Sequence, residues 1–138
     1  MGAFEYSQAT LRIFGDDLIP DELSSVLGAK PTKSRKRGEK QVGKTSGKVR
    51  FAKTGCWFLQ VEKSEPENLD AQIAEILSQL TSDLVVWERL SQSYKVDLFC
   101  GLFMGHWNDG LSISPSTMLA LGQRRIALSL DIYSESNG

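Results

Sequence analysis

The residues of this chain whose types and spacing could support chemistry lie in two short turns. His106, the single histidine, precedes Asp109 by three residues in a glycine-flanked loop, and an imidazole beside an orienting carboxylate can act as a general base. Asp16 and Asp17 adjoin each other after a predicted strand, and paired carboxylates can hold a divalent cation. If the two halves of the chain formed an internal repeat, Asp109 would lie with Asp16 and Asp17 at one edge of the sheet. A small enzyme could then have its active site at this edge.

Both turns also have a simpler structural explanation. Asn, Asp and Gly, which make up residues 108–110, favour turns because they tolerate positive φ. An aspartate between a strand and a helix accepts hydrogen bonds from backbone N–H groups and lies at the positive end of the helix dipole. We therefore predict no catalytic residue, no metal and no cofactor. Four side chains remain candidates for a ligand-binding loop: Asp16, Asp17, His106 and Asp109.

Charge is distributed very unevenly along the chain. Residues 30–53 contain ten lysines and arginines and one glutamate, for a charge of +9, while the rest of the chain carries −10. Such a segment can bind an acidic protein surface or the phosphates of a nucleic acid. No aromatic residue lies between residues 30 and 50 to stack on bases, and the acidic remainder repels a polyanion, so an acidic protein partner is favoured. The candidate contact residues are Lys33, Arg35, Lys36, Arg37 and, in a separate loop, Trp107.

One motif within the basic segment resembles a phosphate-binding loop. Residues 38–45 read Gly-Glu-Lys-Gln-Val-Gly-Lys-Thr, which satisfies the P-loop pattern. A P-loop needs a buried strand before it and an apolar-periodic helix after it, and the sequence provides neither. We therefore predict no nucleotide site here.

Length and composition indicate one folded domain. The chain has 138 residues, 41% of them hydrophobic, which is enough for one core and too short for two. Uncharged stretches such as residues 98–108 are shorter than the ~20 apolar residues of a membrane span. The first residues lack the basic and apolar regions of a signal peptide, so we expect a cytoplasmic protein that does not contact membranes. Cys56 and Cys100 lie in apolar runs and are predicted to be free core residues.

Apolar periodicity predicts strands and helices in alternation. Residues 69–80 carry the clearest helical stripe, and residues 94–104 alternate as a central strand does. The basic segment at about 32–50 has few apolar residues and is expected to be a flexible loop or a loosely paired hairpin. The remaining predictions are strands at 6–14, 55–63 and 126–133, and helices at 19–28, from 83, and at 114–122.

These elements predict a single α+β domain, residues 1–138, with an antiparallel sheet and helices packed on one face. A ferredoxin-like form is one arrangement that the alternation allows. Residues 18–28 and 111–122 each run from an isoleucine and a proline to a terminal glycine, which suggests an internal pseudo-repeat.

Several short segments match, in order, the pattern of a known family. They are Gly-Asp-Asp-Leu-Ile-Pro at 15–20, Leu-Gly-Ala-Lys-Pro-Thr at 27–32, Arg-Gly-Glu at 37–39, Thr-Gly-Cys-Trp at 54–57 and Leu-Ser-Leu-Asp-Ile-Tyr at 128–133. With them the chain resembles the bacterial domain-of-unknown-function 4279 family over nearly its whole length. The resemblance implies a small single-domain cytoplasmic protein with no established reaction, and it suggests a toxin-immunity role.

From the sequence we expect a non-enzymatic protein-interaction module. A more specific form of this expectation is a protein that resembles the immunity proteins that bind toxins. The alternatives are a nucleic-acid-binding module that uses the basic segment and a small enzyme at an edge formed by His106, Asp16 and Asp17.

Overall fold

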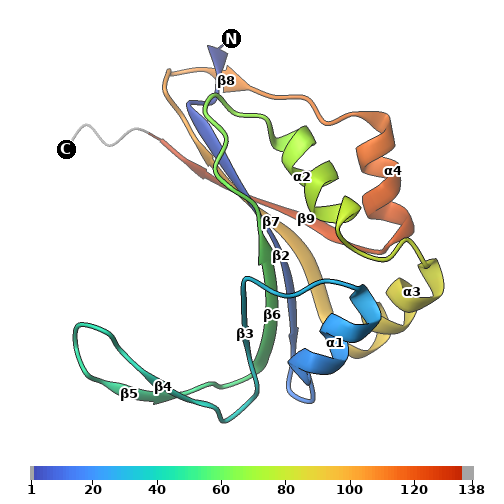
Figure 1. Cartoon of the computed structure of the whole chain (residues 1–138). Coiled ribbons are helices and arrows are strands. Elements are labelled where there is room, and N and C mark those ends of the chain that lie inside the picture. The colour runs from blue at the N-terminus through green and yellow to red at the C-terminus, as the bar shows by residue number, and fades with distance from the viewer. Residues whose placement is uncertain (1, 135–138) are drawn as a thin grey trace.

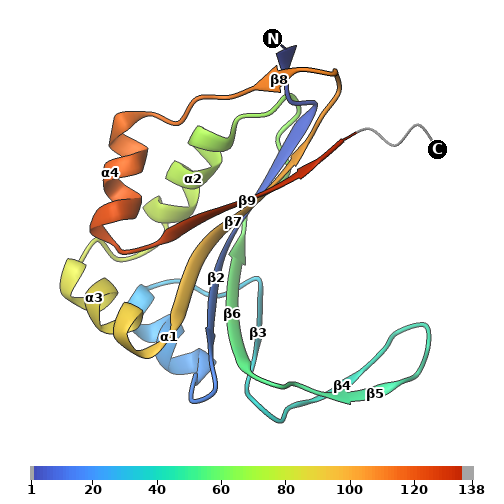
Figure 2. The ribbon, with the colours of Figure 1, turned by 180° about the vertical axis from the view of Figure 1, so that it is seen from behind.

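The computed structural model of the chain describes residues 2–134 and has an α+β fold. Its main sheet has the strand order β3-β6-β2-β7-β9. These strands are β2 (Tyr6–Gly15), β3 (Lys33–Arg35), β6 (Gly55–Gln60), β7 (Lys95–Phe103) and β9 (Ala127–Tyr133). The helices are α1 (Pro20–Leu27), α2 (Leu69–Ser78), α3 (Leu84–Ser93) and α4 (Pro115–Gln123). All four helices lie on one face of the sheet and leave the other face open (Figures 1 and 2), which confirms the predicted class.

One strand departs from the predicted antiparallel sheet. β2 is antiparallel to both β6 and β7, and β3 is antiparallel to β6. β9 instead runs parallel to β7, because α4 carries the chain back to the end of the sheet where β7 began. Apolar and polar side chains alternate alike in parallel and antiparallel strands, so the sequence pattern does not distinguish the two.

The connections through α1 and through α2 and α3 interleave. α1 connects β2 to β3, and β6 lies between these two strands in the sheet. α2 and α3 connect β6 to β7, and β2 lies between those two strands. The expected pseudo-repeat paired α1 with α4, but α4 joins adjacent parallel strands. α1 ends at Gly28, whose φ is +79°, whereas α4 continues through Gly122 to Gln123. The two segments are therefore not structurally equivalent.

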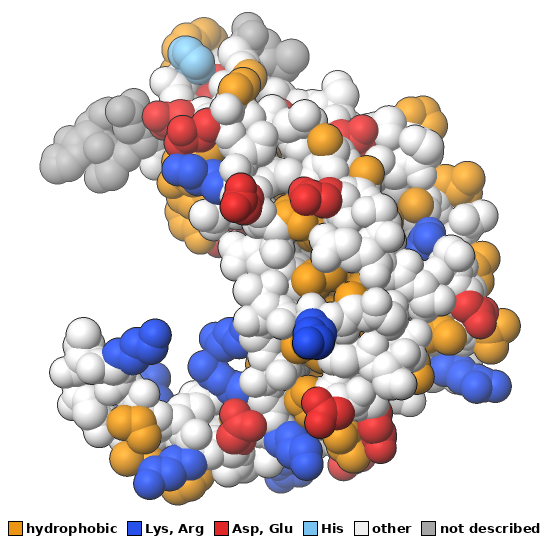
Figure 3. Space-filling view, viewed as in Figure 1, with side chains coloured by type: hydrophobic (Ala, Val, Ile, Leu, Met, Phe, Trp, Pro, Cys, Tyr) orange, Lys and Arg blue, Asp and Glu red, His pale blue; other side chains and the backbone are white. Residues whose placement is uncertain are grey.

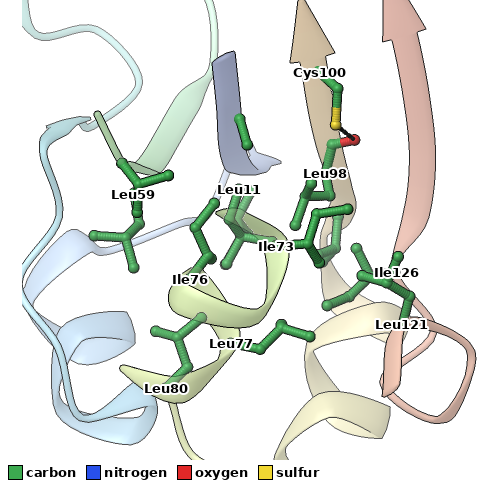
Figure 4. Close-up of a cluster of buried hydrophobic side chains, with 14 of the residues drawn as sticks. Leu11, Leu59, Ile73, Ile76, Leu77, Leu80, Leu98, Cys100, Leu121 and Ile126 are labelled. Carbon is green, nitrogen blue, oxygen red and sulfur yellow. Dashed lines mark hydrogen bonds between the residues drawn. The ribbon is translucent and has the colours of Figure 1, made fainter. Parts of the chain in front are cut away.

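The core lies between the helices and the sheet (Figure 4). Leu98, Cys100 and Leu102 on β7 are buried with Ile73 and Ile76 of α2, as the alternation on that strand predicts. Trp57 and Trp87 are also fully buried. Their indole N–H groups donate to Ser24 Oγ at 3.0 Å and to the Thr81 carbonyl at 2.8 Å, so neither polar atom is left unpaired.

Two further strand pairs extend from opposite ends of the main sheet. β1 (Gly2–Ala3) pairs with β8 (Asp109–Gly110), and β4 (Lys40–Val42) pairs with β5 (Val49–Phe51). Residues 36–54, which carry β4 and β5, project from the sheet and are called the hairpin arm below (Figure 1). The basic segment is thus not one loop: its first part is the edge strand β3, and the rest is the hairpin arm.

Candidate functional site: a basic cleft between the hairpin arm and the sheet

The hairpin arm and the open face of the sheet enclose a cleft of about 370 Å³. Figure 3 shows this hollow, with Lys and Arg side chains gathered around it. The cations that line it come from β3, from β5 and from the segment before β6, and no acidic side chain lines it. They are Lys33, Arg35, Arg50 and Lys53. A larger hollow of about 450 Å³, between α2 and α4, has Arg124 as its single charged lining residue.

Arg35 connects the edge of the main sheet to the hairpin arm. The amide oxygen of Gln41 on β4 accepts from Nη1 and Nε of Arg35, each at 2.8 Å. Gln41 is paired across the hairpin arm with Arg50 on β5, so these two side chains share the inner face of the arm, to which Arg35 of β3 is joined through Gln41. A guanidinium held through two of its donors keeps its remaining N–H groups available for a ligand. The cleft thus presents an arginine that is already oriented.

Aromatic rings form the floor of the cleft. Phe14 and Phe58 pack edge to face, with ring centroids 5.4 Å apart. Lys33 Nζ lies 5.8 Å from the centroid of Phe58, and the guanidinium of Arg12 lies 5.3 Å from that of Phe14. Cation–π contacts of this kind occupy ring faces that a base would otherwise use for stacking.

The outer face of the hairpin arm carries three apolar side chains and also Lys40, which is the cross-strand partner of Phe51. Val42 and Val49 are cross-strand partners that are 60% and 50% exposed, and Phe51 on the same face is 64% exposed. An isolated two-stranded ribbon is marginally stable in water, and exposed apolar side chains gathered on one are typical of a contact surface. The hairpin arm therefore has a polar, cationic inner face and an outer face on which three exposed apolar side chains lie with Lys40.

The predicted basic cluster divides between two places. Lys33 and Arg35 reach the cleft, whereas Lys36 lies beside the start of α1 and Arg37 forms an exposed ion pair with Asp16, N to O 3.6 Å. Arg50 and Lys53 also line the cleft and were not among the residues predicted from the sequence. Only the pairing of β4 with β5 brings Arg50 beside Arg35, and short, highly charged strands give no apolar alternation that would predict it.

The pair of His106 and Asp109 closes a turn. His106 Nδ1 lies 2.8 Å from Asp109 Oδ1, and Asp109 Oδ2 accepts from the backbone N–H groups of Gly105 at 2.9 Å and His106 at 3.1 Å. Burial opposes ionisation of Asp109, but these donors and the imidazole outweigh it and lower the pKa of that carboxyl. The carboxylate therefore holds the loop together, and its acceptors face the protein rather than a substrate.

The residues proposed for an enzymatic edge are far apart. Asp16 and Asp17 follow the last residue of β2, while Asp109 pairs with Gly2 beyond the first residue of that strand. The ten residues of β2 span about 30 Å at about 3.3 Å per residue. Within residues 2–134, no group of three or more His, Cys, Asp or Glu side chains is arranged to hold a metal ion.

The other residues singled out from the sequence have simple environments. Trp107 is 92% exposed in the loop before β8, at the end of the molecule opposite the hairpin arm (Figure 1). Cys56 and Cys100 are buried and free, as predicted. Burial, with a smaller effect of the Asp97 charge, raises the pKa of Cys100 to about 12, so its thiol stays protonated and unreactive. The P-loop-like motif ends at residues 43–45, which lie in the turn of the hairpin arm at 43–48. This turn leads into β5 and not into the helix that a P-loop needs.

In the described part of the chain, no helix has the length and hydropathy needed to cross a bilayer. No curated protein and no solved structure matches the chain. A family model described as "Domain of unknown function (DUF4279)" matches residues 4–135, which confirms the resemblance carried by the short sequence segments. The chain belongs to this DUF4279 family.

Proposed function

We propose that this protein is a non-enzymatic interaction module whose basic cleft and hairpin arm bind an acidic, partly apolar segment of a partner protein. The observation that carries the proposal is the two-faced hairpin arm, with Arg50 and Gln41 on its inner face and exposed Val42, Val49 and Phe51 beside Lys40 on its outer face. A partner that contacts both faces would neutralise the cleft and cover the apolar side chains. A nucleic acid would use the cations and Phe51 and would leave Val42 and Val49 uncovered.

A nucleic-acid-binding role is the second candidate, and one observation favours it. Phe51 is exposed beside the cations of the cleft, which is the combination that binds single strands. Against it, the faces of Phe14 and Phe58 already contact Arg12 and Lys33, and the protein outside residues 30–53 carries −10. We therefore rank the protein partner first.

The proposal includes three finer statements. We place the protein in the cytoplasm, in agreement with its two free cysteines. The narrowest form of the function is immunity-like, with a toxin as the acidic partner. We also infer that β2-α1-β3 and β6-α2-α3-β7 form a ferredoxin-like unit, because their strand order is β3-β6-β2-β7, and that α4 and β9 are additions to it.

The test is a selection of displayed random peptides on the immobilised protein. We expect the selected sequences to be rich in Asp and Glu and to contain apolar residues. The double variant Arg35→Gln/Arg50→Gln should lose this preference, because it removes the cations that the hairpin arm and β3 present to the cleft. The double variant Arg89→Gln/Arg125→Gln, which removes two exposed arginines elsewhere, is the matched control and should select the same sequences.

Selected peptides without acidic residues would contradict the proposal, and so would an acidic preference that survives Arg35→Gln/Arg50→Gln. Tight binding of single-stranded oligothymidylate at about 0.15 M salt, lost in the same variant, would establish the second candidate instead.

A further inference from the structure

The two edges of the main sheet differ in how they are protected. Edge strands expose unpaired backbone groups, which proteins usually guard with charged side chains, prolines or short strand length. β3, at one edge, has three residues, of which Lys33 and Arg35 are cationic. β9, at the other edge, has seven residues and carries a single charge, Asp131. Of the two edges of the main sheet within residues 2–134, β9 is therefore the one left as an open template for another strand.

The apolar side chains of β9 are exposed at this edge. Leu128, Leu130 and Ile132 are 38%, 48% and 54% exposed, although they point to the side of the sheet that carries the helices. The opposite side of the strand is occupied, because Ser129 donates to Asp97 at 3.0 Å and Tyr133 stacks on Phe103 with centroids 4.7 Å apart. A strand added beside β9 would cover the exposed row.

The hydrogen bonds between β7 and β9 show which backbone groups remain free. The Tyr133 carbonyl accepts from the Met104 N–H at 2.9 Å, so the peptide groups of Tyr133 point toward β7. Because alternate residues of a strand direct these groups to opposite sides, those of Leu128, Leu130 and Ile132 point away from the sheet. The same residues thus supply both the free backbone groups and the exposed apolar side chains.

We propose that β9 pairs antiparallel with β9 of a second copy of this chain, so that two sheets join into one around a two-fold axis at Leu130. This register places Leu128 opposite Ile132 of the second copy and Leu130 opposite Leu130. The free N–H and C=O groups of each strand then face those of the other along the whole strand. It also places Asp131 opposite Ser129 rather than opposite a second carboxylate.

The neighbouring two-fold registers are less favourable. An axis at Asp131 would set two carboxylates directly opposite each other, and like charges in that position destabilise a strand pair. An axis at Ser129 would leave Ile132 and Tyr133 beyond the paired residues. The repulsion of the two carboxylates and the loss of paired residues therefore both favour the axis at Leu130. A second copy of the chain supplies the complementary strand, so no other partner is needed.

The test is the mass of the protein in solution across a concentration series, measured by sedimentation. We expect the wild-type protein to approach twice its chain mass of 15.3 kDa and Leu130→Lys to stay at 15.3 kDa. Val85→Lys, at a position that is 53% exposed on α3, adds the same charge elsewhere and should still form the dimer. Ile132→Lys provides a second edge variant, and thermal melting checks that each variant is folded.

Oxidation of variants with one cysteine, made in a Cys56→Ala/Cys100→Ala background, tests the register; this background is needed because Cys100 on β7 is the cross-strand partner of Leu130. In the proposed pairing the two Leu130 Cα atoms lie about 5.5 Å apart, within the range of about 4.4–6.8 Å that a disulfide spans. Leu130→Cys should therefore give a covalent dimer on a non-reducing gel, while Asp131→Cys should not. A wild-type protein that is monomeric throughout the series, or a dimer that persists in a folded Leu130→Lys variant, would overturn the proposal.

Discussion

Arg12 and Asp97 form the most enclosed ion pair in the described part of the protein, at the centre of the open sheet face. Asp97 is buried and accepts from Arg12 Nε at 2.8 Å, from Arg12 Nη2 at 2.6 Å and from Ser129 Oγ at 3.0 Å. These contacts join β2, β7 and β9. The Arg12 guanidinium also lies 4.2 Å from the ring centroid of Phe99, so its charge is held by both a carboxylate and an aromatic face.

Replacing Arg12 with methionine should lower the free energy of unfolding by about 2–3 kcal/mol. Asp97 would keep its burial and lose its cation, although solvent reaches the 27% exposed Arg12 side chain and moderates the loss. Urea unfolding measures this change, and Arg89→Met on α3 should change the value by less than about 0.5 kcal/mol. A change of that small size in Arg12→Met would mean that the ion pair does not stabilise the sheet.

Asp70 makes the stability of the protein depend on pH. Its Oδ1 accepts from the Ser114 N–H at 2.9 Å, and this bond, opposed by burial and supported by the hydroxyls of Thr117 and Ser114, lowers the pKa of the carboxyl. When the pKa of a carboxyl is lower in the folded protein than in the unfolded chain, where it is about 3.9, the ionised carboxyl stabilises the fold at pH values above the unfolded pKa. This stabilisation is lost as the pH falls through the folded pKa.

We therefore expect Asp70→Asn to lower the melting temperature near neutral pH and to change it little in strong acid, where the wild-type carboxyl is protonated. Melting curves from about pH 6 down to about pH 2 check this. Asp17→Asn, at an exposed aspartate, is the control and should follow the wild-type curve. An equal difference between Asp70→Asn and wild type at every pH would show that ionisation of Asp70 is not the cause.

The identity of single site residues could be predicted only in part. Lys33 and Arg35 were selected from the sequence because they lie in the densest run of cations, and the structure places both in the cleft. Phe14 and Phe58 looked like ordinary strand residues, because nothing in a local sequence shows which face of a sheet stays uncovered. The hydrogen bonds between Arg35 and Gln41 could not be predicted, because they depend on where the chain turns back after β3.

At the scale of elements, long amphipathic segments were predictable and short charged strands were not. The stripe of α2 and the alternation of β7 each extend over several turns or residue pairs, so their periods are unambiguous. β3, β4 and β5 have three residues each, and pairing with neighbours rather than intrinsic preference makes them strands. The parallel direction of β9 depends on the path of the chain through α4.

The hairpin arm should be the first part of the folded protein to be cut by trypsin. Lys44 and Lys48 lie in its exposed turn, where local opening costs little. Lys33 should be cut later, because β3 is hydrogen-bonded to β6. Mass spectrometry of early digestion products measures the order, and a first cut within α2 or α3 would contradict this description of the hairpin arm.

At the scale of the whole molecule, positive and negative charge are separated in space. The +9 segment forms β3 and the hairpin arm at one end, and the −10 remainder forms the body. Screening over about 8 Å at about 0.15 M salt leaves only close contacts effective. The cleft can thus attract a nearby acidic surface, while the body weakens long-range attraction of a polyanion.

We therefore expect single-stranded oligothymidylate to bind weakly at low salt and not measurably at about 0.15 M salt, as followed by fluorescence anisotropy. Changing Lys33, Arg35, Lys36 and Arg37 to glutamine should remove the low-salt binding as well. Arg89→Gln/Arg125→Gln should leave it unchanged. Saturable binding at about 0.15 M salt that the four substitutions abolish would make nucleic acid the preferred partner.

The position of β2 also determines when the fold can form during synthesis. β2 is made early, yet it lies between β6 and β7, and its Arg12 pairs with Asp97, which is 85 residues further along the chain. At about 5–20 residues per second, a ribosome needs roughly 4–17 s to bridge that separation. Until β6 is made, a strand that will become central has two open edges, and until β7 is made it keeps one. A nascent chain therefore cannot complete its sheet before β7 has left the ribosome, and chaperone binding to β2 is expected until then.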